Sequence, residues 1–507
     1  MSNIYRFERP SDLEILTKPT LTVAVVIACR GGQEKLDLVL ASLAAQSYPS
    51  RLISVYIIDD GSEVAISLPK IRPTKSKIIA YKNSAGKWGK TAATNDVAGK
   101  LKEDVLWFID ADMVFDPDHL DHHMKWHHNA DDYAVLGWKR FVDQWSYSPS
   151  ELLAQLNDGN FLDLHEVSWG KDLWEERVDR TEDLVKPALD GYRAFVGATF
   201  SIRSQQWRAL GGYNRELITG EDTELGWRIF TAGLRTVVDR QAHSWHLGYS
   251  TVEKNKDLIH RHNDPALAQF IPQMHVIRAR HSLRYKVPTY NVLIDARKSS
   301  LAQVQKIESD LLILNGTTAE FTLLAPWNLL QNRYSPINDE LSDMREIFNW
   351  FKGDRKYQLL SIDESAELTI DQILTYFTAS ATPYYLFTEG TFDLNLKDLV
   401  DHLLASGNGI VGVANKDDRR ALALFAPALA RGSRTQGRLY ANIAAQFGLK
   451  WMTEENFERI NQGKHNRLLR FFRYLKREGK KINSPRQLII FITKVASLFM
   501  RKAFRRG

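Results

Sequence analysis

Four short segments of the sequence each place carboxylate or imidazole groups at or just beyond the end of an apolar run. In a parallel sheet the carboxyl ends of the strands meet at one edge, and open α/β sheets bind their ligands at that edge. The four segments therefore predict a single site at one edge of a sheet. In chain order they are Val55–Ser62 (VYIIDDGS), Trp107–Asp112 (WFIDAD), Gly220–Asp222 (GED) and Ser244–His246 (SWH).

Strand-like and helix-like patterns alternate in the N-terminal part of the chain. Residues 21–29, 53–58 and 105–109 are apolar and β-rich, as strands buried on both faces are. A helical pattern with leucines at 36, 40 and 43 follows the first of them. This alternation predicts an α/β protein with a doubly wound, mostly parallel sheet.

Taken together, the four segments resemble the inverting family-two glycosyltransferases of the GT-A fold, over roughly residues 20 to 285. Such enzymes move a sugar from a nucleotide onto an acceptor hydroxyl. The specificity of the resemblance lies in the set, because an isolated Asp-Ala-Asp is common by chance. It implies a UDP-sugar donor and a glycan or lipid-linked acceptor, in cell-envelope or surface polysaccharide synthesis. The alternative is a non-catalytic protein that keeps the fold and binds sugar nucleotides or serves as a scaffold.

The Asp-Ala-Asp segment predicts a metal site. Asp110 and Asp112 are two residues apart on an extended strand end, so their side chains share a face and could hold Mg²⁺ or Mn²⁺. The resemblance implies that Asp110 lies nearer the ribose and that Asp112 is the direct ligand. It also implies that His246 completes the metal shell, which would favour Mn²⁺, with His243 as the competing histidine.

The resemblance also assigns the base and the donor pocket. Asp222 is the expected general base for the acceptor hydroxyl, and Glu221 is the alternative base. A non-catalytic explanation for both acids is that they cap the N-terminus of the following helix. Residues 84–91 fall one residue short of a phosphate-binding loop, so an NTPase is a weaker alternative. The residues expected to bind the nucleotide are Ala28, Arg30, Asp59, Asp60, Lys87, Lys90 and Asp110.

Four further segments of the N-terminal part are distinctive in sequence. Residues 197–203 and 211–213 resemble the small-residue turn and loop that shape an acceptor cleft. The acidic segment 150–190 is expected to be an insertion near the acceptor or a solvated pair of helices. Histidines crowd residues 119–128, and without a convincing carboxylate nearby they are expected on a solvated helix face.

A second alternation begins after Pro288. Residues 289–297 resemble the first strand, residues 384–394 resemble the strand that carries Asp110, and residues 424–431 faintly resemble 195–203. Thr388-Glu-Gly replaces Asp-Ala-Asp, and no Glu-Asp follows. These features predict a degenerate GT-A-like domain, with an unrelated α/β domain as the alternative. The predicted domains are 1–285 (catalytic), 286–462 (degenerate) and 463–507 (tail).

Length and composition indicate several domains and a reducing compartment. A chain of 507 residues exceeds what one core usually serves, and its only cysteine, Cys29, excludes an internal disulfide and fits a reducing cytoplasm. No apolar run reaches about 18 residues, and the N-terminus lacks the apolar region of a signal peptide.

The net charge of +6 is divided unevenly along the chain. From Lys464 onward there are 14 Lys or Arg against one acid, a net +13, which leaves −7 on the preceding residues. Interleaved apolar residues make this tail suit a helix on anionic lipid, with a nucleic-acid arm or a partner-protein helix as alternatives. A cytoplasmic protein, peripheral at the inner membrane face and without a nucleic-acid partner, is therefore expected. No oligomeric state is predicted.

Overall fold

A computed structural model describes most of the chain. The described residues are 9–82, 89–143, 145–159, 173–185, 190–248, 255–278, 285–312, 316–378, 380–417 and 419–462. Internal contacts separate a large unit, Met1–Val411 with Ala421–Lys450, from a smaller one that includes 412–420 and 451–462. Lys87, Trp169 and the predicted tail, 463–507, lie outside the described residues.

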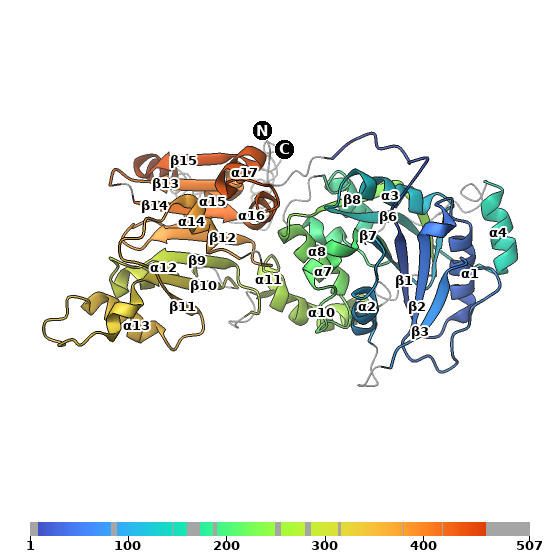
Figure 1. The fold of residues 1–507 in the computed structure, drawn as a ribbon, viewed down its shortest axis with the longest axis horizontal. Coiled ribbons are helices and arrows are strands. Elements are labelled where there is room, and N and C mark those ends of the chain that lie inside the picture. The colour runs from blue at the N-terminus through green and yellow to red at the C-terminus, as the bar shows by residue number, and fades with distance from the viewer. Residues whose placement is uncertain are drawn as a thin grey trace, which may run out of the picture. The chain divides into compact units, whose positions relative to one another are not determined.

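The first sheet carries the predicted site edge and is drawn in blue to green in Figure 1. Its order is β3-β2-β1-β4-β7-β6-β8-β5, in which β1, β2, β3 and β4 are parallel and β7 is antiparallel to β4 and β6. The α/β class is confirmed. The strands are β1 (Val23–Cys29), β2 (Ile53–Asp59), β3 (Ser76–Ala80), β4 (Val105–Asp110), β5 (Met113–Phe115), β6 (Tyr133–Val142), β7 (Thr199–Arg203) and β8 (Arg235–Leu247).

Apolar clusters on both faces hold this sheet. Alternate residues of β1 enter different clusters: Val23, Val25 and Ile27 one, Ala24 and Val26 another. The predicted leucine helix packs on the first of these clusters. The helices of this part are α1 (Gln33–Ala44), η1 (Ser50–Leu52), α2 (Lys90–Ala98), α3 (His119–Asn129), α4 (Pro149–Asn157), α6 (Leu173–Arg180), η2 (Gly191–Ala194), α7 (Ser204–Leu210), α8 (Glu221–Thr231), α10 (Lys256–Phe270) and α11 (His275–Arg278).

The acidic segment 150–190 contains helices α4 and α6 among its described residues, and they are not fully solvated. Leu152 and Leu156 of α4 are buried, as are Trp174 and Val178 of α6. The Trp174 indole N–H donates to the carbonyl of Ala194 at 2.7 Å. Each helix therefore buries an apolar stripe, although its role toward an acceptor remains a prediction.

The second sheet repeats the strand order of the first. Its order is β11-β10-β9-β12-β14-β13-β15, the same as that of the first sheet once β5 is left out, and β14 is antiparallel to β12 as β7 is to β4. This repetition agrees with a second GT-A-like domain; the domain boundaries themselves remain predictions. The strands are β9 (Tyr290–Asp295), β10 (Ala319–Ala325), β11 (Tyr357–Ser361), β12 (Tyr384–Glu389), β13 (Ile410–Ala414), β14 (Arg420–Phe425) and β15 (Leu449–Thr453).

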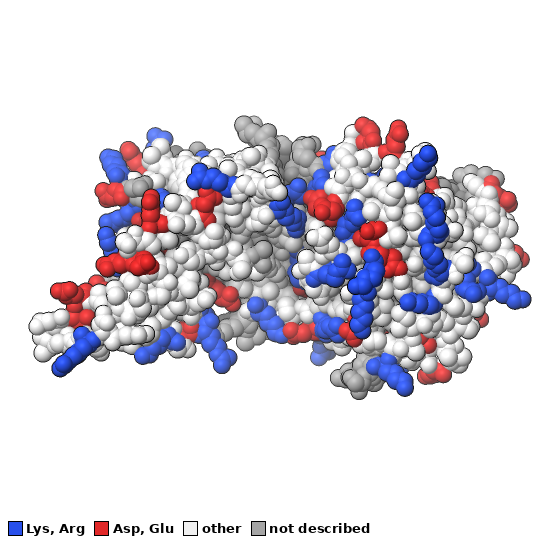
Figure 2. All heavy atoms as spheres, viewed as in Figure 1, with Lys and Arg blue, Asp and Glu red and all other residues white. Residues whose placement is uncertain are grey.

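Helices connect the strands of the second sheet, as Figure 1 shows in yellow to red. They are α12 (Leu301–Leu311), η3 (Trp327–Gln331), α13 (Ser342–Phe351), α14 (Ile370–Thr375), α15 (Leu396–Ser406), α16 (Ala426–Gly432) and α17 (Leu439–Phe447). Within the described residues, no helix is long and apolar enough to span a membrane. On the face drawn in Figure 2, basic and acidic side chains are interspersed.

Strand register corrects the residue equivalences expected between the two sheets. Asp110 pairs with Ala28, the sixth residue of β1, and Glu389 pairs with Asp295, the sixth residue of β9, which has the place of β1 in the second sheet. Glu389, and not Thr388, therefore occupies the place of Asp110. The expected likeness of 424–431 to 195–203 is also wrong, because residues 426–432 form helix α16 whereas 199–203 form strand β7.

The expectation of a solvated histidine face on α3 is wrong. His119, His123 and His127 are fully buried against the sheet. The ring nitrogens of His123 and His127 both contact the hydroxyl of Ser201 at 2.8 Å. Gly137 leaves room for them, since a Cβ there would lie 2.5 Å from the His119 ring. Hydroxyl groups of Thr199 and Ser201 on the sheet, and not carboxylates, thus contact these three buried rings.

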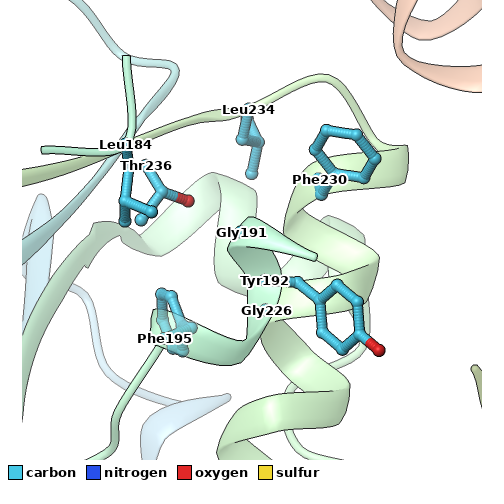
Figure 3. Close-up of a pocket in the computed structure, with 8 residues that line it drawn as sticks. All are labelled: Leu184, Gly191, Tyr192, Phe195, Gly226, Phe230, Leu234 and Thr236. Atoms are coloured by element: carbon cyan, nitrogen blue, oxygen red, sulfur yellow. The ribbon is translucent and has the colours of Figure 1, made fainter. Parts of the chain in front are cut away.

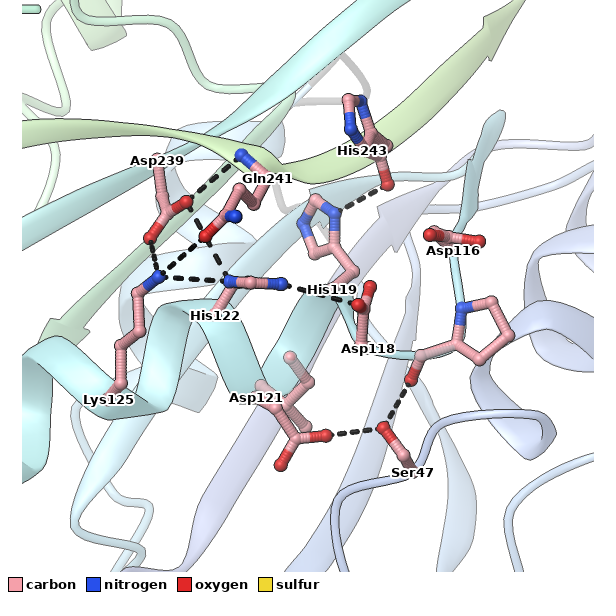
Figure 4. Close-up of polar contacts among 12 residues, drawn as sticks. Ser47, Asp116, Asp118, His119, Asp121, His122, Lys125, Asp239, Gln241 and His243 are labelled. Carbon is pink, nitrogen blue, oxygen red and sulfur yellow. Dashed lines mark hydrogen bonds and ion pairs between the residues drawn. The ribbon is translucent and has the colours of Figure 1, made fainter. Parts of the chain in front are cut away.

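A polar network covers the outer part of the same helix. Figure 4 shows His122 between Asp118 and Lys125, whose ammonium lies 2.8 Å from a carboxylate oxygen of Asp239. Burial, and then the nearby Asp118 carboxylate, raise the pKa of Asp116 to about 7. The network gives the buried ammonium of Lys125 an acidic partner.

Burial of neutral histidines predicts acid sensitivity. Burial, and then the charges of Arg203 and His128, lower the pKa of His127 to about 3, whereas an unfolded histidine titrates near about 6.5. As pH falls from 6.5 toward 3, the unfolded state gains a proton that the folded state does not. The wild type should therefore lose up to about 1.4 kcal/mol of stability per pH unit relative to His127→Gln.

Urea unfolding at pH 7.5, 6.5 and 5.5 measures this difference. His260→Gln is the control, because that side chain is 57% exposed. Equal pH dependence of the unfolding free energy in wild type and His127→Gln would contradict the prediction.

Candidate active site

The carboxyl ends of three neighbouring strands bring the predicted residues to one edge. Parallel pairing places Cys29 of β1 beside Asp59 of β2, and Ala28 of β1 beside Asp110 of β4. Asp60 follows β2 directly, and its backbone N–H donates to the carbonyl of Cys29 at 3.0 Å. Residues that are far apart in the sequence are thus neighbours because of register alone.

Antiparallel pairing of β5 with β8 brings the histidine to the aspartates. Met113 pairs with His246, and the Leu247 N–H donates to the carbonyl of Asp112 at 2.9 Å. One ligand atom from each of Asp110, Asp112 and His246 lies within 4.8 Å of the other two. Two carboxylates and an imidazole at this spacing fit a divalent cation.

The protonation of His246 also fits a metal ligand. Its Nδ1 lies 3.0 Å from the carbonyl of Gly248, which can only accept, so Nδ1 carries the proton. Nε2 then has a free lone pair and faces Asp112 Oδ1 at 3.5 Å. Metal-binding histidines commonly donate their other ring N–H in this way. The side chain of His243, the competing candidate, does not belong to this group.

Lys90 joins the metal group to the acids of α8. Its Nζ lies 2.9 Å from Asp110 Oδ1 and 3.8 Å from Glu221 Oε1. Burial opposes the charge of Lys90, but Asp110 and Glu221 outweigh it and raise the lysine pKa well above its ordinary value. Burial also disfavours ionised Asp110, and Lys90 reverses this effect, so the pKa of Asp110 is lowered.

The two acids at the start of α8 have different surroundings. Asp222 is fixed by the backbone, because its Oδ2 accepts from the Gly197 N–H at 3.1 Å and its Oδ1 from the Thr223 N–H at 2.7 Å. Burial raises the pKa of Asp222 despite these hydrogen bonds. Burial also raises the pKa of Glu221, to about 7, against the attraction of Lys90. Both carboxyls are thus easier to protonate than ordinary acids.

The adjacent aspartates after β2 also differ. Asp59 Oδ1 accepts from the backbone N–H and the hydroxyl of Ser62, at 2.9 and 2.6 Å, so it stabilises its own turn. Asp60 accepts from the Gly89 N–H at 2.8 Å through Oδ2, whereas its buried Oδ1 has no hydrogen-bond partner among the described residues. A buried, unpaired carboxylate oxygen suits a ligand donor, so Asp60 is the better candidate of the two. Arg30 is exposed at the same edge.

Lys35 is a member of the site that the sequence did not reveal. It lies on α1, and its Nζ is 3.3 Å from Asp112 Oδ2 and 2.7 Å from the carbonyl of Leu247. The only sequence signal is its position in the first turn of the helix after β1, which many solvated lysines share. The contact depends on β8 returning beside β5.

The loop at 211–213 is attached to α2 by a reciprocal pair of hydrogen bonds. The Asn95 side chain donates to the carbonyl of Tyr213 at 2.7 Å and accepts from its N–H at 2.8 Å. Gly212 has a φ of +71°, and a Cβ there would lie 2.4 Å from Asn95 Oδ1. Glycine is therefore required by both backbone conformation and space.

A small apolar cavity beside α8 is not part of this site. It encloses about 10 Å³, close to the minimum of about 10–15 Å³ that a water needs. Figure 3 shows Tyr192, Phe195 and Phe230 around it. Its lining residues are Leu184, Gly191, Tyr192, Phe195, Gly226, Phe230, Leu234 and Thr236, none of which was predicted in the site.

The sheet order and the acidic edge define a protein of the GT-A fold. Residues 24–170 match the model of the family described as Glycosyl transferase family 2. This part of the chain is therefore similar to the family-two glycosyltransferases. A search of curated proteins found no match.

Solved structures give distant likenesses. The mannosyltransferase PcManGT from Pyrobaculum calidifontis, in complex with GDP-Man and Mn²⁺, is 15% identical, with coverage of 55% of this chain and 70% of that chain and a TM-score of 0.33. Residues 1–349 of S. aureus TarS, in complex with UDP-GlcNAc, are 11% identical, with coverage of 52% and 69% and a TM-score of 0.35.

Gly212→Ala should destabilise the protein more than Gly211→Ala. Both glycines have left-handed backbones, with φ of +71° and +78°, but a Cβ at Gly211 meets nothing within 4 Å. The difference isolates the clash with Asn95, and overpacking of this kind costs about 1–3 kcal/mol. Thermal unfolding of both variants and of Asn95→Ala/Gly212→Ala measures it. Similar melting temperatures for the two single variants would refute the proposed clash.

Proposed function

We propose that this protein is a metal-dependent, inverting glycosyltransferase that uses a nucleoside diphosphate sugar, with UDP as the nucleotide. The observation that carries the proposal is the position of Lys90, within 2.9 Å of Asp110 and 3.8 Å of Glu221. One ammonium connects the metal group with the acids of α8. Donor activation and acceptor deprotonation can therefore take place at one centre.

Asp110, Asp112 and His246 would hold the cation, and an imidazole ligand favours Mn²⁺ over Mg²⁺. A divalent cation bound there would neutralise charge on the departing diphosphate. Lys90 supplies a second, permanent positive charge beside Asp110. Asp60 would receive the nucleoside through its unpaired Oδ1.

Asp222 is the proposed general base. Two backbone N–H groups fix its orientation, and its raised pKa makes it a stronger base than an ordinary aspartate. Attack by the deprotonated hydroxyl on the side opposite the leaving diphosphate would invert the anomeric carbon. Glu221 lies next to it but is attracted by Lys90.

The acceptor and cellular location rest on the sequence. We propose a glycan or lipid-linked acceptor, in envelope or surface polysaccharide synthesis, and attachment to anionic membrane through the basic segment 464–507.

The second domain, which we place at 286–462, carries Glu389 where the first carries Asp110. Its Arg297 guanidinium binds Asp295 and the carbonyls of Glu364 and Ala366.

The metal prediction tests the function as a whole. With water or an added glycan as the acceptor of the sugar, full-length protein should release UDP from one member of a panel of UDP-sugars, with Mn²⁺ but not with chelator, and GDP-sugars should give no release. Asp112→Asn and His246→Ala should each lose Mn²⁺-dependent nucleotide binding, measured by calorimetry, because each removes one of three ligands.

His260→Ala, at an exposed position, is the control for these variants. Nucleotide binding that is unchanged by chelator would exclude the metal model. Binding without turnover on any donor and acceptor tested would favour a non-catalytic binding protein.

The base prediction separates the two acids of α8. Asp222→Asn should leave donor affinity nearly unchanged and lower turnover by about a hundred-fold or more. Because the pKa of Asp222 is raised, wild-type turnover should fall as the carboxylate protonates at low pH, and the variant should lack this limb. Steady-state kinetics against pH measure both effects. If Glu221→Gln is inactive while Asp222→Asn retains turnover, Glu221 is the base.

A further inference from the structure

Lys35 places a positive charge directly against a predicted metal ligand. Its Nζ is 3.3 Å from Asp112 Oδ2 and donates to the carbonyl of Leu247 at 2.7 Å. The side chains of Lys35 and Asp112 are 31% and 28% exposed, so the pair is only partly screened by water. The lysine is thus held at the metal group by β8.

The two oxygens of Asp112 face different partners. Oδ1 lies 3.5 Å from Nε2 of His246, another residue of the predicted metal group. Oδ2 faces Lys35. A cation bound through Oδ1 would therefore share one carboxylate with an ammonium.

The charges of the metal group are already matched. Lys90 pairs with Asp110 and Lys35 pairs with Asp112, so two carboxylates have two ammonium partners. A free divalent cation gains little net attraction from such a group and is repelled by both lysines. A diphosphate is negatively charged, so it is attracted by both lysines and by the cation.

We propose that Lys35 weakens the binding of a free divalent cation, so that the cation is retained only together with the nucleoside diphosphate. The inference rests on the proposed function and deepens it. It concerns the order of binding, not the identity of the ligands. Lys35 acts through Asp112 and takes no proton in the reaction.

Titration of full-length protein with Mn²⁺ tests this coupling. The electron paramagnetic resonance signal of free Mn²⁺ gives the affinity with and without UDP or GDP. Wild type should bind Mn²⁺ weakly alone and much more tightly with the nucleotide. Lys35→Met keeps the length of the side chain and removes the charge, so it should bind Mn²⁺ alone at least about tenfold more tightly. The gain in Mn²⁺ affinity on adding nucleotide should therefore be smaller in Lys35→Met than in wild type.

Two variants control for charge and for structure. Lys35→Arg keeps the positive charge and should behave like wild type. Lys356→Met removes a lysine that is 33% exposed, lies 2.8 Å from Glu308 and belongs to the part of the chain with the second sheet; it should also behave like wild type. Circular dichroism and thermal melting of each variant show whether the fold is kept.

The outcomes separate this inference from the proposed function. If wild type retains Mn²⁺ with nucleotide but Lys35→Met binds Mn²⁺ alone no more tightly, the role of Lys35 is wrong and the metal site stands. If Lys35→Arg also tightens Mn²⁺ binding, charge is not the cause and the inference is overturned. If wild type binds no Mn²⁺ with either nucleotide, the proposed function itself fails.

Discussion

The ion pair between Lys90 and Asp110 is the interaction on which the candidate site depends. Carboxylates at a crowded sheet edge repel one another and lose solvation when buried, so they need a fixed positive charge nearby. Lys90 provides it from the first turn of α2, and the same ammonium lies 3.8 Å from Glu221. Asp110 stays ionised while Glu221 and Asp222 are shifted toward neutrality. Lys90 thus keeps Asp110 in the charged form that our proposal requires of a cation ligand, whereas burial moves Glu221 and Asp222 toward the neutral form.

The second sheet shows what remains of the fold when this arrangement is absent. The strand order and the position of the antiparallel strand, β14, are kept, because apolar strands buried on both faces specify them. At the corresponding edge, Gly390 is packed so closely that a Cβ would lie 2.1 Å from the Ser299 hydroxyl. Arg297 is bound there by Asp295 and by backbone carbonyls. The architecture is therefore independent of the chemistry at its edge.

Local properties of this chain can be predicted from its sequence, whereas properties that depend on a distant neighbour cannot. The strands at 23–29, 53–59 and 105–110 were predicted to within two residues, since apolar runs between polar turns are local signals. The buried face of α3 was predicted wrongly, because Ser201 and Gly137, which accommodate its histidines, come from distant strands. Lys35 was missed for the same reason.

The sequence by itself determined the α/β class, the strands that end in acids, and the candidate site residues other than Lys35. Only the tertiary structure decided which of them meet. The pairing of β5 with β8 brings His246 and Leu247 to Asp112, and α2 delivers Lys90 to Asp110. The physical reason is that apolar periodicity specifies which residues are buried, whereas strand register and helix packing specify distances between charges. Coulomb interactions depend on those distances, and so does any chemistry of the site.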